Sequence, residues 1–280
     1  MTRVNRVFAI AAIALVLTLG AMSASAAVAG RINIEGSTTV LPVVQRLAEE
    51  FMAVNKGVKM SIRGGGSGNG IAALIDSRTN IGMSSRFVKM SEIKSAVAKD
   101  VYLVPIRIAI DGIAAVVHPS NSVQKLTVAQ LKSIYAGEVT NWNQVGGPNL
   151  KIVVVARDSS SGTYETWNEL IMGGAKTAST ALVQASNGAV ADLVSRTPGG
   201  IGYVSLGYVS SKLKALPVAT GTHYVAPTVS NVQKGTYPLN RDLFVFTNGW
   251  PQGEVKQFIN FVLGSDGQKV VEDEGFIPLW

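Results

Sequence analysis

Three short segments of the chain, residues 35–39, 63–70 and 157–163, are rich in serine, threonine and glycine. Hydroxyl groups are neutral hydrogen-bond donors, and glycine lets a ligand approach the backbone closely because it has no side chain. Arg157 begins the third segment and can add a charged, bidentate contact to an oxyanion. Together these residue types could bind a tetrahedral anion without making or breaking a bond.

Each of the three segments lies between a predicted strand and a predicted helix. The strands are expected at residues 31–35, 58–62 and 151–156. The helices are expected at 40–54, at a start over residues 70–75, and at 163–172. Pro42 is tolerated in the first of these helices because it falls in the first turn. A helix start has unpaired N–H groups and a positive partial charge, so it favours anions. If the three helix starts converge, donors surround the anion on several sides.

Taken singly, each segment has a simpler interpretation. A serine or threonine before a helix usually caps it, and a glycine-rich turn is usually only a turn. The anion site is favoured because the same design occurs at three strand-to-helix junctions, one of them led by Arg157. That the three junctions meet in space is a prediction, since the sequence contains no distances.

The remaining pattern predicts an α/β protein with mostly parallel sheets, because strands and helices alternate along the chain. Thr127 and Gln130 form a capping pair at the start of one of these helices. Further strands are expected at residues 101–106, 113–117, 202–205 and 243–247, and further helices at 127–135, 190–194 and 254–263. Residues 220–238 are rich in Thr, Pro, Gly and Asn, and are predicted to be a surface loop or a return crossing between lobes.

Several other kinds of site are disfavoured. The glycines of residues 64–70 fit neither a P-loop nor a dinucleotide fingerprint, and Asn69 replaces the last glycine of a G-x-S-x-G elbow. The chain has no cysteine, and its two histidines, His118 and His223, lack metal-binding spacing. We therefore expect no metal, no cofactor and no catalysis. The net charge of +7 is carried by scattered basic residues, which argues against a nucleic-acid partner.

The N-terminal residues 1–26 are predicted to be a cleaved secretory signal. Arg3 and Arg6 precede an apolar run over residues 7–19, and small residues follow at Ala24-Ser25-Ala26. The alternative, a membrane anchor, is disfavoured because the run is shorter than the ~20 residues that span a bilayer. Without a cysteine, no lipid can be attached to an N-terminal cysteine. We expect a periplasmic protein, with the cell wall or the medium as alternatives.

Beyond these single features, the sequence resembles the phosphate-binding proteins of ABC-type phosphate import, and within them the compact branch. The resemblance covers nearly the whole chain after the signal. Its motifs are Ile34-Glu35-Gly36-Ser37-Thr38-Thr39-Val40, Gly65-Gly66-Ser67-Gly68-Asn69-Gly70, Ile81-Gly82-Met83-Ser84-Ser85-Arg86, Asp111-Gly112-Ile113-Ala114, Gly137-Glu138-Val139-Thr140-Asn141-Trp142, Arg157 with Ser161-Gly162-Thr163, Thr197-Pro198-Gly199-Gly200-Ile201-Gly202-Tyr203, and Gly267-Gln268 through Gly275-Phe276-Ile277-Pro278.

The resemblance implies a two-lobed, type II periplasmic binding fold whose chain crosses the hinge near residues 110–112 and again near 219–224. The first lobe would comprise residues 27–110 and 222–280, and the second residues 111–221. Inorganic phosphate would lie between the lobes and pass to the membrane permease subunits of an ABC importer. A monomer is expected, because no heptad or large apolar surface pattern is present.

The resemblance also implies which residues hold the ligand. The hydroxyls and backbone of the first two segments would contact phosphate, and the third segment would close the cage from the second lobe. The expected site residues are Ser37, Thr38, Thr39, Ser67, Gly68, Ser85, Arg86, Asp111, Arg157, Ser161, Gly162 and Thr163.

The chain departs from longer members of the family at two places. Those members carry an aspartate that accepts the proton of bound phosphate, where this chain has Ser84-Ser85-Arg86. They also place an acidic residue two positions after the arginine of the second lobe, where this chain has Ser159, with Asp158 one position earlier. A proton acceptor matters because sulfate has no proton to donate and is repelled by a carboxylate.

Two residues near these departures have alternative interpretations. Asp111 could supply the missing carboxylate, or it could only order the turn at the hinge. Arg86 could meet the ligand, or it could pair with an acidic neighbour such as Glu92.

Other functions remain open at this point. The same fold could bind another oxyanion, such as sulfate, molybdate or a phosphonate. A secreted phosphatase would need a metal or an activated nucleophile, for which the sequence offers no motif. A sensory or adhesion role in the same compartment is a further alternative.

Overall fold

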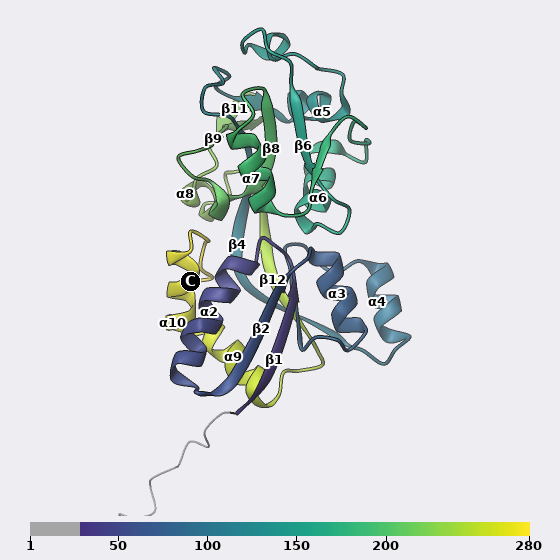
Figure 1. The fold of residues 1–280 in the computed structure, drawn as a ribbon, viewed down its shortest axis with the longest axis vertical. Helices are drawn as coiled ribbons and strands as arrows, with labels where there is room; N and C mark the ends of the chain where they lie inside the picture. The colour runs from purple at the N-terminus through teal and green to yellow at the C-terminus, as the bar shows by residue number, and fades with distance from the viewer. Residues whose placement is uncertain (1–28) are drawn as a thin grey trace, which may run out of the picture.

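The computed structural model describes residues 29–280, so the predicted signal peptide over residues 1–26 lies outside the described part of the chain. Two lobes are stacked along the long axis of the molecule (Figure 1). Each lobe has its own apolar core. One core is built from residues between Ile32 and Ala109 and between Leu243 and Phe276, and the other mainly from residues between Ile113 and Leu239. None of the helices within residues 29–280 has the length and hydropathy that a membrane span requires.

The first lobe is a parallel sheet flanked by helices. Strand β1 (Ala29–Gly36) pairs in parallel with β2 (Gly57–Gly64) and with β3 (Ile81–Ser84). The helices are α2 (Leu41–Val54), α3 (Ser67–Ile75), α4 (Met90–Val97), α9 (Gly253–Leu263) and α10 (Ser265–Asp273). The apolar positions of α2 recur at helical spacing and are buried, and Phe51 packs edge-on against Phe258 of α9 at 5.4 Å.

The second lobe has a parallel core sheet and shorter elements around it. Its strands are β5 (Leu126–Thr127), β6 (Val153–Arg157), β7 (Leu182–Gln184), β8 (Gly200–Ser205), β9 (Lys214–Ala215), β10 (Val218–Thr220) and β11 (His223–Val225). Its helices and turns are α5 (Val128–Ala136), η2 (Trp142–Val145), α6 (Gly162–Trp167), η3 (Asn168–Met172), α7 (Asn187–Ser195), η4 (Leu206–Tyr208) and α8 (Val229–Gln233). The predicted capping pair is confirmed, because Thr127 and Gln130 cap α5 reciprocally.

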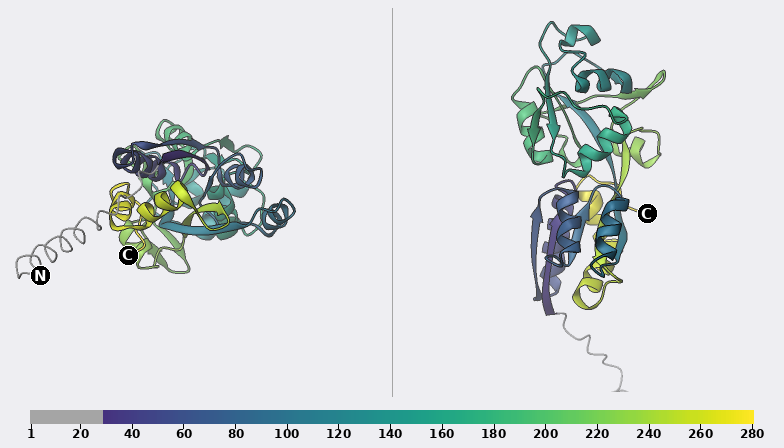
Figure 2. Two further views of the ribbon diagram at one scale, coloured as in Figure 1. Left: turned by 90° about the horizontal axis from the view of Figure 1, so that it is seen from below. Right: turned by 90° about the vertical axis from the view of Figure 1, so that its right-hand side faces the viewer.

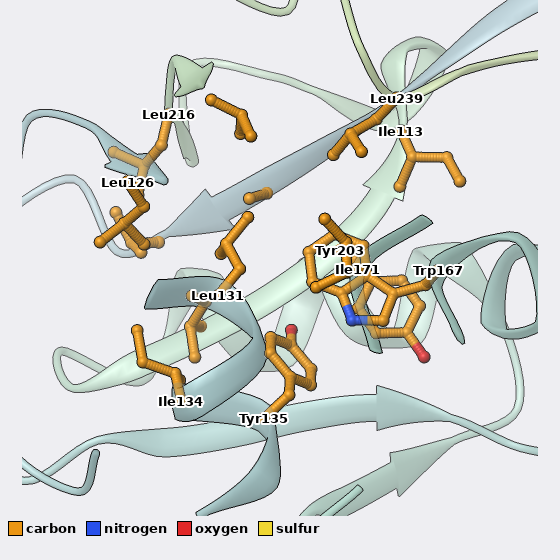
Figure 3. Close-up of a cluster of buried hydrophobic side chains, with 14 of the residues drawn as sticks. Ile113, Leu126, Leu131, Ile134, Tyr135, Trp167, Ile171, Tyr203, Leu216 and Leu239 are labelled. Carbon is orange, nitrogen blue, oxygen red and sulfur yellow. The ribbon is translucent and has the colours of Figure 1, made fainter. Parts of the chain in front are cut away.

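Aromatic rings fill the centre of the second lobe (Figure 3). The Trp167 ring stacks on Tyr203 at 4.5 Å, and Tyr135 lies 5.0 Å from Trp167. The single helix predicted over residues 163–172 is instead α6 followed by the π-helical turn η3, which ends at Gly173 in the left-handed region. This core fixes the start of α6, which faces the other lobe (Figure 1).

Two long strands join the lobes. Strand β4 (Leu103–Val117) is continuous where two separate strands were predicted, and it passes from one core to the other between Ala109 and Ile113. It pairs antiparallel with β12 (Asn240–Asn248), which runs alongside it across the boundary (Figures 1 and 2). The sheet order β2-β1-β3-β12-β4-β8-β6-β7 therefore runs through both lobes, with parallel pairs toward each end and antiparallel pairs at the hinge.

The return crossing lies later in the chain than the predicted residues 219–224. Val232, Tyr237 and Leu239 are buried in the core of the second lobe, and the Tyr237 hydroxyl donates to the Ile113 carbonyl at 2.8 Å. The chain crosses only as β12 begins, so residues 222–239 belong to the second lobe. The prediction was wrong because this stretch is mostly polar, and its few buried apolar residues are too widely spaced to form a recognisable pattern.

Candidate functional site

The three predicted segments meet where the two lobes touch. The Thr39 hydroxyl of the first lobe and the Thr163 hydroxyl of the second lie 3.0 Å apart. Beside them, the Gly68 amide donates to the Ser160 carbonyl at 2.9 Å, and the Ser160 hydroxyl lies 3.2 Å from the Gly65 carbonyl. The structure therefore holds the lobes in a closed arrangement, with the starts of α2, α3 and α6 at one place.

Nearly all the predicted site residues are buried at this junction, and Gly68 alone among them is only partly buried. Ser67 accepts from the Ser85 amide at 3.0 Å and lies 3.4 Å from the Ser85 hydroxyl. Gly162 sits directly against this pair, because a Cβ placed on it would collide with the Ser67 hydroxyl and lie 2.7 Å from that of Ser85. Glycine at this position is what lets the second lobe approach the first so closely.

Two of the predicted hydroxyls accept backbone N–H groups, Ser37 in the turn before α2 and Ser161 as the cap of α6. Ser37 accepts from the Thr39 amide at 3.1 Å and from the Val40 amide at 3.4 Å. Ser161 is the N-cap of α6 and accepts from the Tyr164 amide at 3.2 Å. Capping and ligand binding are compatible here, because an accepting hydroxyl still has its own proton to donate.

Arg157 ends strand β6 and is held rigidly by backbone carbonyls. Its Nε donates to the Gln184 carbonyl and its Nη2 to the Ala185 carbonyl, both at 3.1 Å. Its Nη1 is buried and has no partner among residues 29–280. Burial lowers the pKa of Arg157 and nearby Asp158 opposes this, but a guanidinium keeps its charge in either case. A buried charged donor without a partner calls for an anion at this point.

Two further residues of this site, Arg241 and Asn187, were not predicted from the sequence. Arg241, on β12, donates to the Thr163 hydroxyl at 3.0 Å and to the Thr39 hydroxyl at 3.1 Å. Asn187 begins α7, and its Nδ2 donates to Thr39 at 3.0 Å and to Thr38 at 3.2 Å. A fourth helix start therefore joins the three that were predicted.

Asp111 is linked through Arg241 to the hydroxyl cluster, which is formed by the side chains of Thr39 and Thr163. Its Oδ2 accepts from Arg241 Nε at 3.0 Å and Nη2 at 2.8 Å, and its Oδ1 accepts from the Ser205 hydroxyl at 2.8 Å and the Leu206 amide at 3.3 Å. Complete burial raises the pKa of Asp111, and the charge of Arg241 opposes this. These contacts fit the alternative in which Asp111 orders the hinge. Its proposed role as a proton acceptor stays a prediction.

Of the two alternatives for Arg86, the structure shows the ion pair with Glu92. Its guanidinium binds both carboxylate oxygens of Glu92, at 2.6 and 2.9 Å, and its Nε lies 2.5 Å from Glu165 Oε2. Glu165 belongs to α6 in the second lobe and also pairs with Lys89 at 2.7 Å. Arg86 therefore links the lobes through carboxylates, and a direct ligand contact remains a prediction that these pairs do not support.

Charge at the site is not balanced by the protein itself. Arg157 and Arg241 are both buried, whereas Asp111 is the single fully buried carboxylate of the described chain. Asp158, the other carboxylate near Arg157, has a third of its side chain exposed. Because a buried charge is costly unless it is paired, the excess of one guanidinium favours an anionic ligand.

Comparisons with known protein families and sequences give matches over most of the chain. Residues 21–266 match the family model described as a PBP superfamily domain. The chain is 33% identical over 252 residues to the phosphate-binding protein PstS of Bacillus subtilis, covering 89% of this chain and 81% of that protein. It is 32% identical to PstS of Borreliella burgdorferi, covering 89% of this chain and 90% of that protein.

Two solved structures also superimpose on most of this chain. A crystal structure with bound phosphate, of a Clostridium perfringens protein described as a phosphate ABC transporter substrate-binding protein, superimposes with a TM-score of 0.81 at 32% identity. The superimposed region covers 90% of this chain and 100% of the Clostridium perfringens chain. An ABC-type phosphate transport receptor from Vibrio cholerae gives a TM-score of 0.72 at 34% identity, covering 88% and 99% of the two chains.

Proposed function

Since the chain belongs to the PBP superfamily, and within it to the family of phosphate-binding proteins named PstS, we propose that it captures inorganic phosphate between its lobes and delivers it to the membrane permease subunits of an ABC importer. The relatives are binding proteins of transport, and we infer reversible, non-covalent binding with no reaction. Export by the predicted N-terminal signal to the periplasm belongs to the same proposal.

One observation carries this proposal: the buried Nη1 of Arg157 has no protein partner within residues 29–280, and the segment that Arg157 begins leads to Thr163, where hydroxyls of both lobes meet. An anion bound there would contact the Thr38 hydroxyl from the first lobe and the Thr163 hydroxyl from the second. Because those contacts exist together only when the lobes are closed, the ligand would stabilise the closed state over an open one. We propose that the importer recognises this closed state.

Calorimetry on protein stripped of ligand by unfolding and refolding tests the proposal. We expect one phosphate to bind per chain, and small-angle scattering to show a more compact molecule once phosphate is added. Arg157→Met should lower phosphate affinity at least about tenfold, because a charge-assisted hydrogen bond contributes ~1.5–3 kcal/mol. Arg196→Met is the matched control, since Arg196 is exposed and pairs with Asp192 on α7.

Absence of phosphate binding by the refolded wild-type protein would overturn the proposal. Tighter binding of sulfate or molybdate than of phosphate would move the assignment to another oxyanion while keeping the fold and the site.

A further inference from the structure

The hydrogen bonds around Asn187 settle which way its side-chain amide points. The backbone N–H of Ser205 can only donate, and it lies 3.2 Å from Asn187 Oδ1. The oxygen therefore faces Ser205 and the NH2 group faces the threonines. Its two protons go to Thr38, at 3.2 Å, and to Thr39, at 3.0 Å.

Arg241 is a second donor whose direction is fixed. A guanidinium has no acceptor, and that of Arg241 is held by two hydrogen bonds to Asp111 Oδ2. It is buried, with 4% of its side chain exposed, so it cannot turn out to solvent. Two of its three remaining protons point to Thr39 Oγ1 at 3.1 Å and Thr163 Oγ1 at 3.0 Å.

The protons of the two threonine hydroxyls follow from these donors. A hydroxyl oxygen accepts two hydrogen bonds and donates one. Thr39 already accepts from Asn187 and Arg241, so within residues 29–280 its proton can go only to Thr163, 3.0 Å away. Thr163 then accepts from both Thr39 and Arg241, and its own proton has no acceptor among residues 29–280.

We propose that Asn187 and Arg241 are specificity-determining positioning residues, which make Thr163 an obligate hydrogen-bond donor to the bound anion. This inference rests on the proposed function. The hinge-side wall of the site, formed by Thr39, Thr163, Asn187 and Arg241, then offers the ligand donors only. It has no acceptor for a ligand proton, so a monohydrogen phosphate must direct its P–OH proton away from the hinge.

Asn187→Asp tests this wall, because the substitution keeps the shape of the side chain and replaces the donor with an acceptor. The new carboxylate oxygen would take the protons of Thr38 and Thr39. Thr163 would lose the bond from Thr39 and gain a free lone pair, which a protonated oxyanion can use and sulfate cannot. Phosphate affinity should therefore fall about tenfold, and sulfate affinity by about a further tenfold.

Affinities for phosphate and sulfate are to be measured by competition on the refolded wild-type protein and both variants. The control is Asn141→Asp, which keeps the N-cap acceptor of η2, and it should leave both affinities unchanged. Equal losses for phosphate and sulfate in Asn187→Asp would mean a merely structural role and would overturn the inference, while wild-type phosphate binding would leave the proposed function standing.

A neutron structure of the phosphate complex decides the point directly. The deuteron of Thr163 Oγ1 should lie on the side of the ligand and that of Thr39 should lie toward Thr163. A Thr163 deuteron directed at Thr39 would contradict the inference even if sulfate binding is too weak to measure.

Discussion

Arg86 of the first lobe and Glu165 of the second form an ion pair across the lobe boundary, with Nε and Oε2 2.5 Å apart. Both side chains are mostly shielded from solvent, at 8% and 17% exposure, so salt screens the pair less than it would a surface pair. Lys89 adds a second cation to the same carboxylate. This cluster stabilises closure without belonging to the hydroxyl cluster.

The first prediction concerns this ion pair. Glu165→Gln should shift the lobes toward an open state and lower phosphate affinity roughly fivefold, because it removes about 1 kcal/mol of interlobe attraction. Stopped-flow fluorescence should locate the loss mainly in faster phosphate release. Glu169→Gln is the control, since Glu169 lies one turn further on and forms no ion pair within residues 29–280.

If Glu165→Gln and Glu169→Gln behave alike, closure does not depend on the ion pair. Added salt should also narrow the difference between wild type and Glu165→Gln, as expected for an electrostatic contact.

The second prediction concerns the close approach at Gly162. Gly162→Ala would place a methyl group against the Ser67 and Ser85 hydroxyls, so the lobes could close only by displacing them. An overpacked contact costs ~1–3 kcal/mol, which corresponds to a loss of phosphate affinity of roughly 5- to 150-fold. Gly188→Ala is the control, because a Cβ there meets its neighbours only at 3.8 Å.

The stability of the protein without ligand separates two explanations for such a loss. Thermal unfolding of ligand-free Gly162→Ala should match that of wild type, since the collision exists only in the closed state. A large drop in the melting temperature would mean that the substitution disturbs the second lobe itself.

The third prediction concerns Asp111. Asp111→Asn leaves the buried guanidinium of Arg241 without its counter-ion, and breaking a buried pair in this way costs about 3–5 kcal/mol of folding stability. Chemical denaturation should detect this. Asp242→Asn is the control. Asp242 follows Arg241 on β12 and is more exposed than Asp111, so its replacement should cost less than about 1 kcal/mol of folding stability.

The same variant also tests the two roles of Asp111. If it only orders the hinge, the ratio of phosphate to sulfate affinity stays unchanged in Asp111→Asn. A marked gain of sulfate relative to phosphate would instead support Asp111 as the proton acceptor.

The fourth prediction concerns the late return crossing. Tyr237→Phe removes the donor to the Ile113 carbonyl and leaves that buried acceptor unpaired, at a cost of about 1–3 kcal/mol in the free energy of unfolding. Tyr224→Phe, at a partly exposed ring, should have little effect. Equal urea midpoints for the two variants would mean that residues 222–239 are not anchored in the second lobe as described.

Much of this architecture could be predicted from the sequence because the signals are local. The alternation of strands and helices, the Thr127–Gln130 cap and the three Ser/Thr/Gly junctions are all patterns of neighbouring residues. Asn187 had a weak signal of the same kind, since Ser186 and Asn187 follow a short strand and open a helix.

Arg241 had no such signal. It lies inside a strand, 130 residues after the carboxylate that it pairs with, and nothing in its neighbours indicates that register places the two side by side. The ion pair between Arg86 and Glu165 was missed for the same reason, because it depends on how closely one lobe approaches the other.

The hinge itself limits how the molecule can move. Its two strands are paired residue by residue across the boundary, with Arg241 opposite Asp111 and Asn240 opposite Gly112. Because both strands cross the boundary together, the lobes should open by bending of this ribbon, as in a hinge. The two lobe edges that border the ligand site would then return to the same relative position each time the lobes close. A membrane partner would therefore contact the same surface in every transport cycle.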